Sequence, residues 1–276
     1  MSEINVVANA IIVNNTGAAV TQDGLCNNSY LLHKNQLKES VSRVVPSETA
    51  NSAGFLSLYD GASNLKFITT GAGTHDFDFT LPQATNINAM SCAGGNMLSA
   101  GVTWEFYTYD ADSALFVKRA DGSGKRDNSP VFNTFDTVTT NQVRFRFICS
   151  SAFEVGELSA GLALRLPVPP SIGYTPARWN TNNKTNTGQT EANTFSRSTV
   201  LQRGATESAS FENVETEWLD QNWIDVIDNL GEPIWFSGDQ RLKPNDVIYG
   251  HLKTGSNPSY TNSFYSTVKI DIDGAK

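Results

Sequence analysis

The stretch HDFDFTL, residues 75–81, alternates polar and apolar side chains at every position. Successive side chains of a β-strand point to opposite faces of its sheet, so a period of two sorts them into two sets. Two phenylalanines and a leucine fall on one face, and two aspartates and a threonine on the other. The stretch therefore predicts a strand with one buried face and one solvated face.

Outward from this stretch the same pattern recurs along the chain. Residues 102–109 alternate in the same way, and residues 113–119 follow them after an Asp-Ala-Asp turn, which predicts a hairpin. Further short strands are predicted at 131–135 and 143–149. Turn signals recur about every 8–15 residues, a spacing typical of a β-sandwich or jelly roll.

The composition favours the same fold class. Lys, Arg, Asp and Glu make up 17% of the 276 residues, whereas 26 Asn and 26 Thr together outnumber the 48 charged residues. Helical bundles need Glu, Lys, Arg and Ala, so this balance favours strands and Asn-rich turns. A net charge of −8 argues against a nucleic-acid partner. No apolar run is long enough to span a membrane, and the start lacks a signal peptide, so a cytoplasmic origin is expected.

Prolines mark a change of pattern around residues 166–171, where three prolines fall in four positions. We expect a first domain over residues 1–170, with an N-terminal strand or arm in 1–50, and a second β-rich domain over 171–276. Residues 180–189 are polar and turn-rich, which predicts an exposed loop or edge-strand arm; a subunit-crossing arm is the functional alternative.

The second region contains one predicted helix near 215–230. Its apolar residues share one face, and Asn213 or Thr216 is expected to cap its start, with Gly231 and Pro233 ending it. The apolar stripe consists of Leu219, Trp223, Val226, Ile227 and Leu230. Strands are predicted around the helix at 208–211, 234–237, 247–252 and 263–272, with Phe264, Val268, Ile270 and Ile272 on one side.

Motifs for common enzyme chemistry are incomplete. Residues 71–76 begin like a dinucleotide-binding loop but lead into a strand, and residues 122–125 resemble a phosphate loop in which Arg119 and Arg126 replace the required glycine and hydroxyl residues. No GxSxG elbow occurs. The cysteines (Cys26, Cys92, Cys149) and histidines (His33, His75, His251) lack metal-ligand spacing, and Cys149 is predicted to be a buried core residue. The sequence predicts a non-enzymatic protein without a cofactor.

Two pairs of carboxylates leave a structural calcium site as an open alternative. Asp110 with Asp112, and Asp271 with Asp273, carry the hard oxygen ligands that calcium prefers. Both pairs are equally typical of solvent-facing turns. A glycosidase-type acid and base pair would have to assemble from distant positions.

A longer pattern suggests a family. The strand at residues 74–82, the small-residue strand and Asn-containing turn at 87–97, and the Ala-Gly step into the aromatic strand at 99–106 resemble the galactose-binding-like (discoidin-type) jelly rolls of bacteriophage tail proteins. The Gly-Glu-x-x-x-Gly rhythm within 154–164 is similar to the closing strands of that family. The sequence departs from the family pattern at Gly95, where a histidine is more common.

The resemblance implies a non-enzymatic structural component of a phage virion, in the tail, baseplate or fibre attachment. Such a protein assembles in the host cytoplasm, contacts other virion proteins and forms a symmetric homo-oligomer. The polar arm near 180–195 and the N-terminal strand 6–13 are the expected subunit-crossing segments.

The alternative function is a carbohydrate-binding module that contacts host surface glycans. Sugar sites stack rings on exposed aromatic side chains and use Asn, Asp and Arg as hydrogen-bonding groups. Tyr107, Tyr109 and Trp179 are the candidate contacts, with Trp104 also available, although strand alternation accounts for most of these aromatics.

Overall fold

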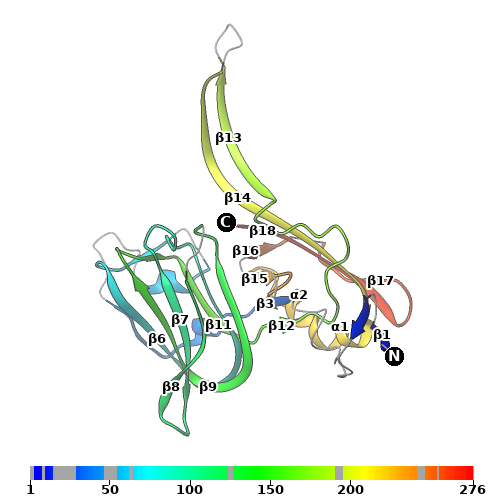
Figure 1. Cartoon of the computed structure of the whole chain (residues 1–276), viewed down its shortest axis with the longest axis horizontal. Helices are drawn as coiled ribbons and strands as arrows, with labels where there is room; N and C mark the ends of the chain where they lie inside the picture. The colour runs from blue at the N-terminus through cyan, green and yellow to red at the C-terminus, as the bar shows by residue number, and fades with distance from the viewer. Residues whose placement is uncertain are drawn as a thin grey trace.

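The computed structural model describes residues 3–7, 10–14, 29–46, 55–61, 65–123, 127–189, 195–240, 246–253 and 255–275. Two antiparallel sheets dominate these residues, and a pair of short helices accompanies the second one (Figure 1). The mainly β fold class predicted from the sequence is confirmed.

The first sheet runs in the order β11-β6-β9-β7-β8, with β4 also paired to β6. Its strands are β4 (Ser42–Val44), β6 (Gly73–Ala93), β7 (Thr103–Asp110), β8 (Leu115–Gly122), β9 (Val131–Cys149) and β11 (Glu157–Gly161). The short pair β5 (Phe67–Ile68) and β10 (Glu154–Val155) and the 3-10 turns η2 (Gln36–Glu39) and η3 (Phe55–Leu58) accompany it. The predicted hairpin corresponds to β7 and β8.

The predicted short strands at 131–135 and 143–149 belong to one strand, β9. It pairs with β6 over almost its whole length, and the register shifts between Thr80 and Thr85 and again between Ile87 and Ala89. Irregularities of this kind bend a strand and increase its twist. The continuous β6–β9 pair curls accordingly (Figure 1). The residues between 135 and 143 therefore lie in the bend of one strand and do not separate two strands.

Phenylalanines fill the core of this first half. The side chains at alternate positions of β6 and β9 are buried, and neighbouring rings meet edge to face at centroid distances of 5.4–6.0 Å. The buried rings are Phe67, Phe77, Phe79, Phe106, Phe145, Phe147 and Phe153. Cys149 is buried beside them, as predicted, and 7% exposed. Burial of this many aromatic side chains is the main stabilising contribution to the half.

The second sheet runs in the order β12-β3-β15-β16-β18-β14-β13, with β17 paired to β18. Its strands are β3 (Tyr30–Leu32), β12 (Leu164–Arg165), β13 (Thr181–Gln189), β14 (Phe195–Glu215), β15 (Pro233–Ser237), β16 (Val247–Leu252), β17 (Ser259–Tyr260) and β18 (Tyr265–Ala275). β3 and β12 precede residue 170 and nevertheless pair within this sheet. The division at residue 170 stays a prediction.

The predicted helix consists of α1 (Thr216–Asn222) and α2 (Ile224–Asp228), separated only by Trp223. Its apolar stripe packs into the second core, as expected. The predicted N-caps, Asn213 and Thr216, are wrong, because the N-cap is Glu215, which makes no side-chain capping bond. The helix ends at Asp228, before Gly231 and Pro233. Phe264 also departs from its predicted face, because it lies before β18 and is 74% exposed.

A third cluster of buried side chains joins the two halves. It combines Ala89, Ala93 and Phe132 of the first sheet with residues of the second, and its members are Leu32, Ala89, Ala93, Phe132, Ala163, Trp235, Val247 and Tyr249. Trp235 Nε1 donates to Ser159 Oγ at 2.8 Å across this contact. The halves are therefore packed together through a shared apolar interface.

Two hairpins are distinct from the body of the protein: one extends the edge of the second sheet and the other forms a separate two-stranded sheet. β13 and the first part of β14 form a long hairpin that projects from the body (Figure 1). The prediction of a single strand at residues 6–13 is wrong. These residues belong to a tight hairpin of β1 (Glu3–Val7) and β2 (Ala10–Asn14). None of the helices in the described ranges has the length and apolar character needed to cross a membrane.

Candidate functional site

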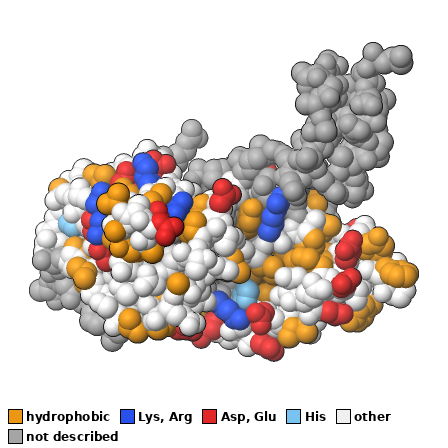
Figure 2. All heavy atoms as spheres, turned by 90° about the horizontal axis from the view of Figure 1, so that it is seen from below, with side chains coloured by type: hydrophobic (Ala, Val, Ile, Leu, Met, Phe, Trp, Pro, Cys, Tyr) orange, Lys and Arg blue, Asp and Glu red, His pale blue; other side chains and the backbone are white. Residues whose placement is uncertain are grey.

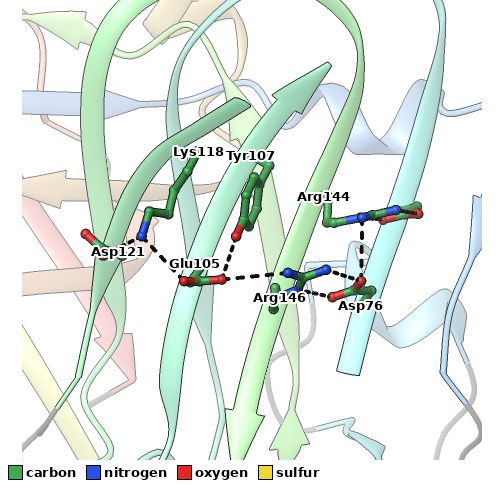
Figure 3. Close-up of polar contacts among 8 residues, drawn as sticks. Asp76, Glu105, Tyr107, Lys118, Asp121, Arg144 and Arg146 are labelled. Carbon is green, nitrogen blue, oxygen red and sulfur yellow. Dashed lines mark hydrogen bonds and ion pairs between the residues drawn. The ribbon is translucent and has the colours of Figure 1, made fainter. Parts of the chain in front are cut away.

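The solvent-facing side of the first sheet carries eight side chains in one polar network (Figure 3). We call this surface the polar face; its residues are Asp76, Asp78, Glu105, Tyr107, Lys118, Asp121, Arg144 and Arg146. Their positions follow from strand register, because outward-pointing residues at paired positions lie side by side. The polar face is thus built by four strands that are distant in sequence.

One row of the polar face crosses the sheet from β6 to β7. Asp78 pairs with Arg144 in the β6–β9 register, and Arg144 pairs with Tyr107 in the β9–β7 register. Arg144 Nε and Nη2 donate to the two oxygens of Asp78 at 2.6 and 2.7 Å. This two-point contact fixes the guanidinium plane on the sheet surface.

The second row lies two residues further along the same strands, at the Asp76–Arg146 pair. Arg146 Nε and Nη2 donate to the two oxygens of Asp76 at 2.7 and 2.8 Å, and Arg146 Nη1 lies 4.0 Å from Glu105 Oε2. Arg144 Nη1 is 3.6 Å from Asp76 Oδ2, which joins the two rows. Lys118 closes the network at the β8 end, with its Nζ 2.9 Å from Asp121 and 3.4 Å from Glu105.

The ion pairs shift the pKa values of Asp76 and Arg146 in the directions that favour their charged forms. The hydrogen bonds from Arg146 to Asp76, together with the positive charges of Arg146 and Arg144, hold the pKa of Asp76 below its ordinary value despite partial burial. The pKa of Arg146 is raised for the reciprocal reason. Burial and the neighbouring Glu105 raise the pKa of Tyr107, so its hydroxyl stays protonated and donates to Glu105 Oε2 at 2.6 Å.

Aromatic rings border the charged rows. Arg144 lies over the ring of Phe116 at 4.2 Å, Arg146 lies 5.4 Å from the ring centroid of Tyr107, and Tyr109 meets Phe116 edge to face at 5.6 Å. These rings are partly exposed. The polar face consequently combines fixed planar polar groups with partly exposed rings.

The predicted glycan contacts do not form one group. Tyr107 belongs to the polar face and Tyr109 borders it beside Phe116. Trp104, in contrast, is 6% exposed and points to the other side of β7, where its Nε1 donates to Asn133 at 3.1 Å. Trp179 is 70% exposed but precedes β13 in the second half of the chain, with Arg178 over its ring at 4.9 Å. Of these aromatics, only Tyr107 belongs to the polar face, with Tyr109 at its border.

The carboxylate pairs that the sequence offered as calcium ligands make hydrogen bonds and ion pairs with other groups of the protein. Asp110 accepts from Asp112 N at 3.2 Å and from Ser113 Oγ at 2.8 Å, as in an ordinary Asx turn. Asp271 and Asp273 each lie 2.9 Å from a lysine. Within the described ranges, no three His, Cys, Asp or Glu side chains gather where they could hold a metal ion.

Gly95, where the sequence departs from the tail-protein pattern, lies in a turn that has a structural role. The neighbouring Asn96 donates to the carbonyl of Ala152 at 3.1 Å and accepts from Glu154 N at 2.8 Å. A Cβ at Gly95 would lie 2.7 Å from the carbonyl oxygen of Glu154, so a side chain does not fit there without movement. The turn therefore offers no ligand group at this position.

Sequence reasoning did not single out the arginines and aspartates of the polar face. The alternation placed them on the solvated side of their strands, but pairing Asp76 with Arg146 requires the register of strands 70 residues apart. A useful signal was present in retrospect: RFR at residues 144–146 has the same spacing as DFD at 76–78. Complementary charges at matching spacing indicate neighbouring strands.

Comparison with known proteins gives distant structural matches only. No family model matches the chain, and no curated protein matches it. Among solved structures, a family 32 carbohydrate-binding module from NanJ of Clostridium perfringens in complex with galactose matches at 16% identity and a TM-score of 0.40, covering 48% of this chain and 98% of that one.

Two further matches have similar values. A pectin-binding carbohydrate-binding module matches at 15% identity and a TM-score of 0.38, covering 49% of this chain and 96% of that one. A GH29 fucosidase of Ruminococcus gnavus in complex with fucose matches at 13% identity and a TM-score of 0.41, and the match covers 48% of this chain but only 27% of the fucosidase. At these scores the likeness assigns no function.

Proposed function

We propose that this protein binds carbohydrate without acting on it, and that the polar face holds the glycan. The observation that carries the proposal is the pair of cross-strand rows, in which four carboxylates and three cations lie beside Tyr107 on one sheet surface. Sugars are recognised by planar hydrogen-bonding side chains next to aromatic rings. The polar face supplies both kinds of group.

The charged groups of the polar face are already paired with one another, which favours a ligand without charge. Their side chains are already held by ion pairs and hydrogen bonds, so little rotamer freedom remains to be lost when a ligand binds. The paired side chains of the two rows are 20–31% exposed, which leaves part of their surface available to hydroxyl groups. The surface of a sheet suits an extended glycan chain lying along it.

A matched pair of double variants tests the proposal. In D76N/R146Q both charges of one row are replaced by neutral side chains of similar size, so that no unpaired charge is left behind. In the control, K253Q/D273N removes an exposed ion pair of the second half in the same way. We expect the parent and the control to bind on a glycan array, and D76N/R146Q to lose most of that binding while keeping its circular dichroism spectrum.

Two results would contradict the proposal. One is a parent protein that binds no glycan on a broad array. The other is a D76N/R146Q variant that binds glycans as tightly as the control, because the ion-pair rows would then be structural only.

A structural role in a phage virion remains a second candidate function. One observation favours it: the β13–β14 hairpin projects well beyond the body of the protein (Figure 1), as a subunit-crossing arm would. Replacing residues 184–202 with a two-residue turn after the Asn183–Arg203 pair shortens this arm. This candidate predicts a defined multimer by light scattering for the parent and a monomer for the shortened chain; a monomeric parent would exclude assembly by this route.

A further inference from the structure

A cavity of about 230 Å³ lies at the junction of the two halves, away from the polar face. It is bordered by the segment around η2, by β11 of the first sheet, and by β15 and β16 of the second. Its volume is below the roughly 300–1,000 Å³ of drug-sized ligand sites, so any occupant must be small. We call it the junction cavity.

Two buried polar side chains line the junction cavity, and one of them, His33, lacks a partner. His33 is 9% exposed and neither of its ring nitrogens has a hydrogen-bond partner, whereas Tyr249 is 4% exposed and its hydroxyl lies against Glu157. Leaving a buried polar atom unpaired costs about 1–3 kcal/mol. A bound molecule that pairs with these atoms would recover part of that cost.

Glu157 of β11 provides a third group on the wall. It is 2% exposed; its Oε1 accepts from Asn35 Nδ2 at 3.2 Å and its Oε2 from Gly61 N at 3.0 Å. A carboxylate has about four acceptor positions, so at least one remains on Glu157 beside Asn35, Gly61 and Tyr249. The rings of Trp235 and Tyr249 are tilted by 40° at a centroid distance of 4.5 Å and form an aromatic wall beside it.

The cations near the cavity are engaged at its rim. Lys34 Nζ lies 2.9 Å from Asp225, and Lys38 pairs with Glu232. Figure 2 shows basic and acidic side chains close together where the two halves meet. The interior therefore offers acceptors, whereas the nearest protein cations are occupied by other carboxylates.

We propose that the junction cavity binds a small organic cation that carries N–H donors, a guanidinium or primary ammonium group, against Glu157, Tyr249 and neutral His33. Such a group donates several hydrogen bonds in fixed directions, and its positive charge pairs with the ionised carboxylate of Glu157. The wall of Trp235 and Tyr249 suits the flat apolar side of a guanidinium.

Burial shifts the pKa values of the groups that line the junction cavity. It raises the pKa of Glu157 to about 8 and lowers the pKa of His33, to which Lys34 also contributes. Burial, followed by the charges of Glu157, Asp60 and Glu232 and by the hydrogen bond to Glu157, raises the pKa of Tyr249. The other charged groups that face Glu157 are Lys38 from η2 and Asp60 after η3. Binding of a cation at pH 7 therefore transfers the proton of Glu157 to the buffer.

Titration calorimetry with n-butylguanidinium tests this site, with n-butylurea as its neutral counterpart of similar shape. The dissociation constant of butylguanidinium is expected to fall about tenfold for each unit by which the pH rises toward 8, and to level off above pH 8. Repeating the titration in buffers of different ionisation enthalpy should show release of about one proton at pH 6 and about 0.1 at pH 9. Butylurea should bind at least tenfold more weakly at pH 8.

Variants separate this site from the polar face and from misfolding. E157Q resembles the protonated acid and should keep its fold. Its affinity for butylguanidinium should be at least tenfold lower than that of the parent at pH 8 and should no longer depend on pH. Y249F should weaken binding a few-fold with the pH dependence intact. D76N/R146Q should bind butylguanidinium as the parent does, so failure of the glycan proposal leaves this one standing. Absence of butylguanidinium binding at millimolar concentration, equal binding of butylurea, or pH-independent binding would each overturn the inference.

Discussion

Raising the pH from 6 to 9 is expected to lower the free energy of unfolding by about 5 kcal/mol, because two buried glutamates resist ionisation. Glu157 lies on the wall of the junction cavity, and Glu207 lies in the second half, where it accepts from the hydroxyl of Tyr174. Burial is the largest cause in both cases and raises each pKa from 4.5 to about 8. The charge of Asp246 adds to the effect at Glu207.

The sign follows from proton binding. Between pH 4.5 and 8 the unfolded chain has lost these two protons and the folded protein has kept them, so rising pH favours unfolding. Integrating from pH 6 to 9 gives a loss of about 2.6 kcal/mol for each glutamate. Below pH 4.5 both states are protonated and the full stability is present.

Urea denaturation followed by circular dichroism at pH 6 and pH 9 measures this difference. E157Q and E207Q should each remove about half of the pH-dependent loss, since glutamine cannot ionise, and the double variant should show little loss. The carboxamide oxygen at position 207 can still accept from Tyr174, which makes the substitution a mild one. A parent whose stability is the same at both pH values, or a double variant as sensitive as the parent, would refute the reasoning.

Three further predictions concern packing and the polar face. Phe145→Ala should cost about 3–5 kcal/mol by urea denaturation, because the ring is fully buried among other phenylalanines; a cost below 1 kcal/mol would contradict that core. Gly250→Ala should lower the melting temperature strongly, since its Cβ would lie 2.2 Å from the carbonyl oxygen of Asp273, whereas Gly231→Ala, with open space around it, should leave it nearly unchanged. Asp76→Asn should cost only about 1 kcal/mol in thermal unfolding, as expected for a partly exposed ion pair; a loss of 3 kcal/mol or more would mean that the pair is effectively buried.

Much of the strand structure could be predicted from local alternation. Phe77 and Phe79 face the core because a period of two leaves no other arrangement once one face is apolar, and Leu219 to Leu230 form a helical stripe for the corresponding reason at a period of 3.6. The ends of elements were less predictable. β9 continues through residues that resemble a turn because β6 pairs with it on both sides of the bend.

The candidate sites depend on contacts that local patterns do not contain. The rows of the polar face need the register between β6, β9 and β7, and the junction cavity needs the packing of η2 and β11 against β15 and β16. Glu157 appeared in sequence only as part of a Gly-Glu-x-x-x-Gly rhythm. Its burial arises from segments that are distant in sequence, since Asn35 and Gly61 hydrogen-bond to its carboxyl group and β15 and β16 lie on the same cavity.

Glycan binding at the polar face is the central claim, and a direct titration tests it. A glycan selected on an array is titrated by calorimetry into the parent, D76N/R146Q and K253Q/D273N at one pH and salt concentration. The account predicts equal affinity for the parent and K253Q/D273N, and at least a tenfold loss for D76N/R146Q. Equal affinity for all three proteins would contradict it.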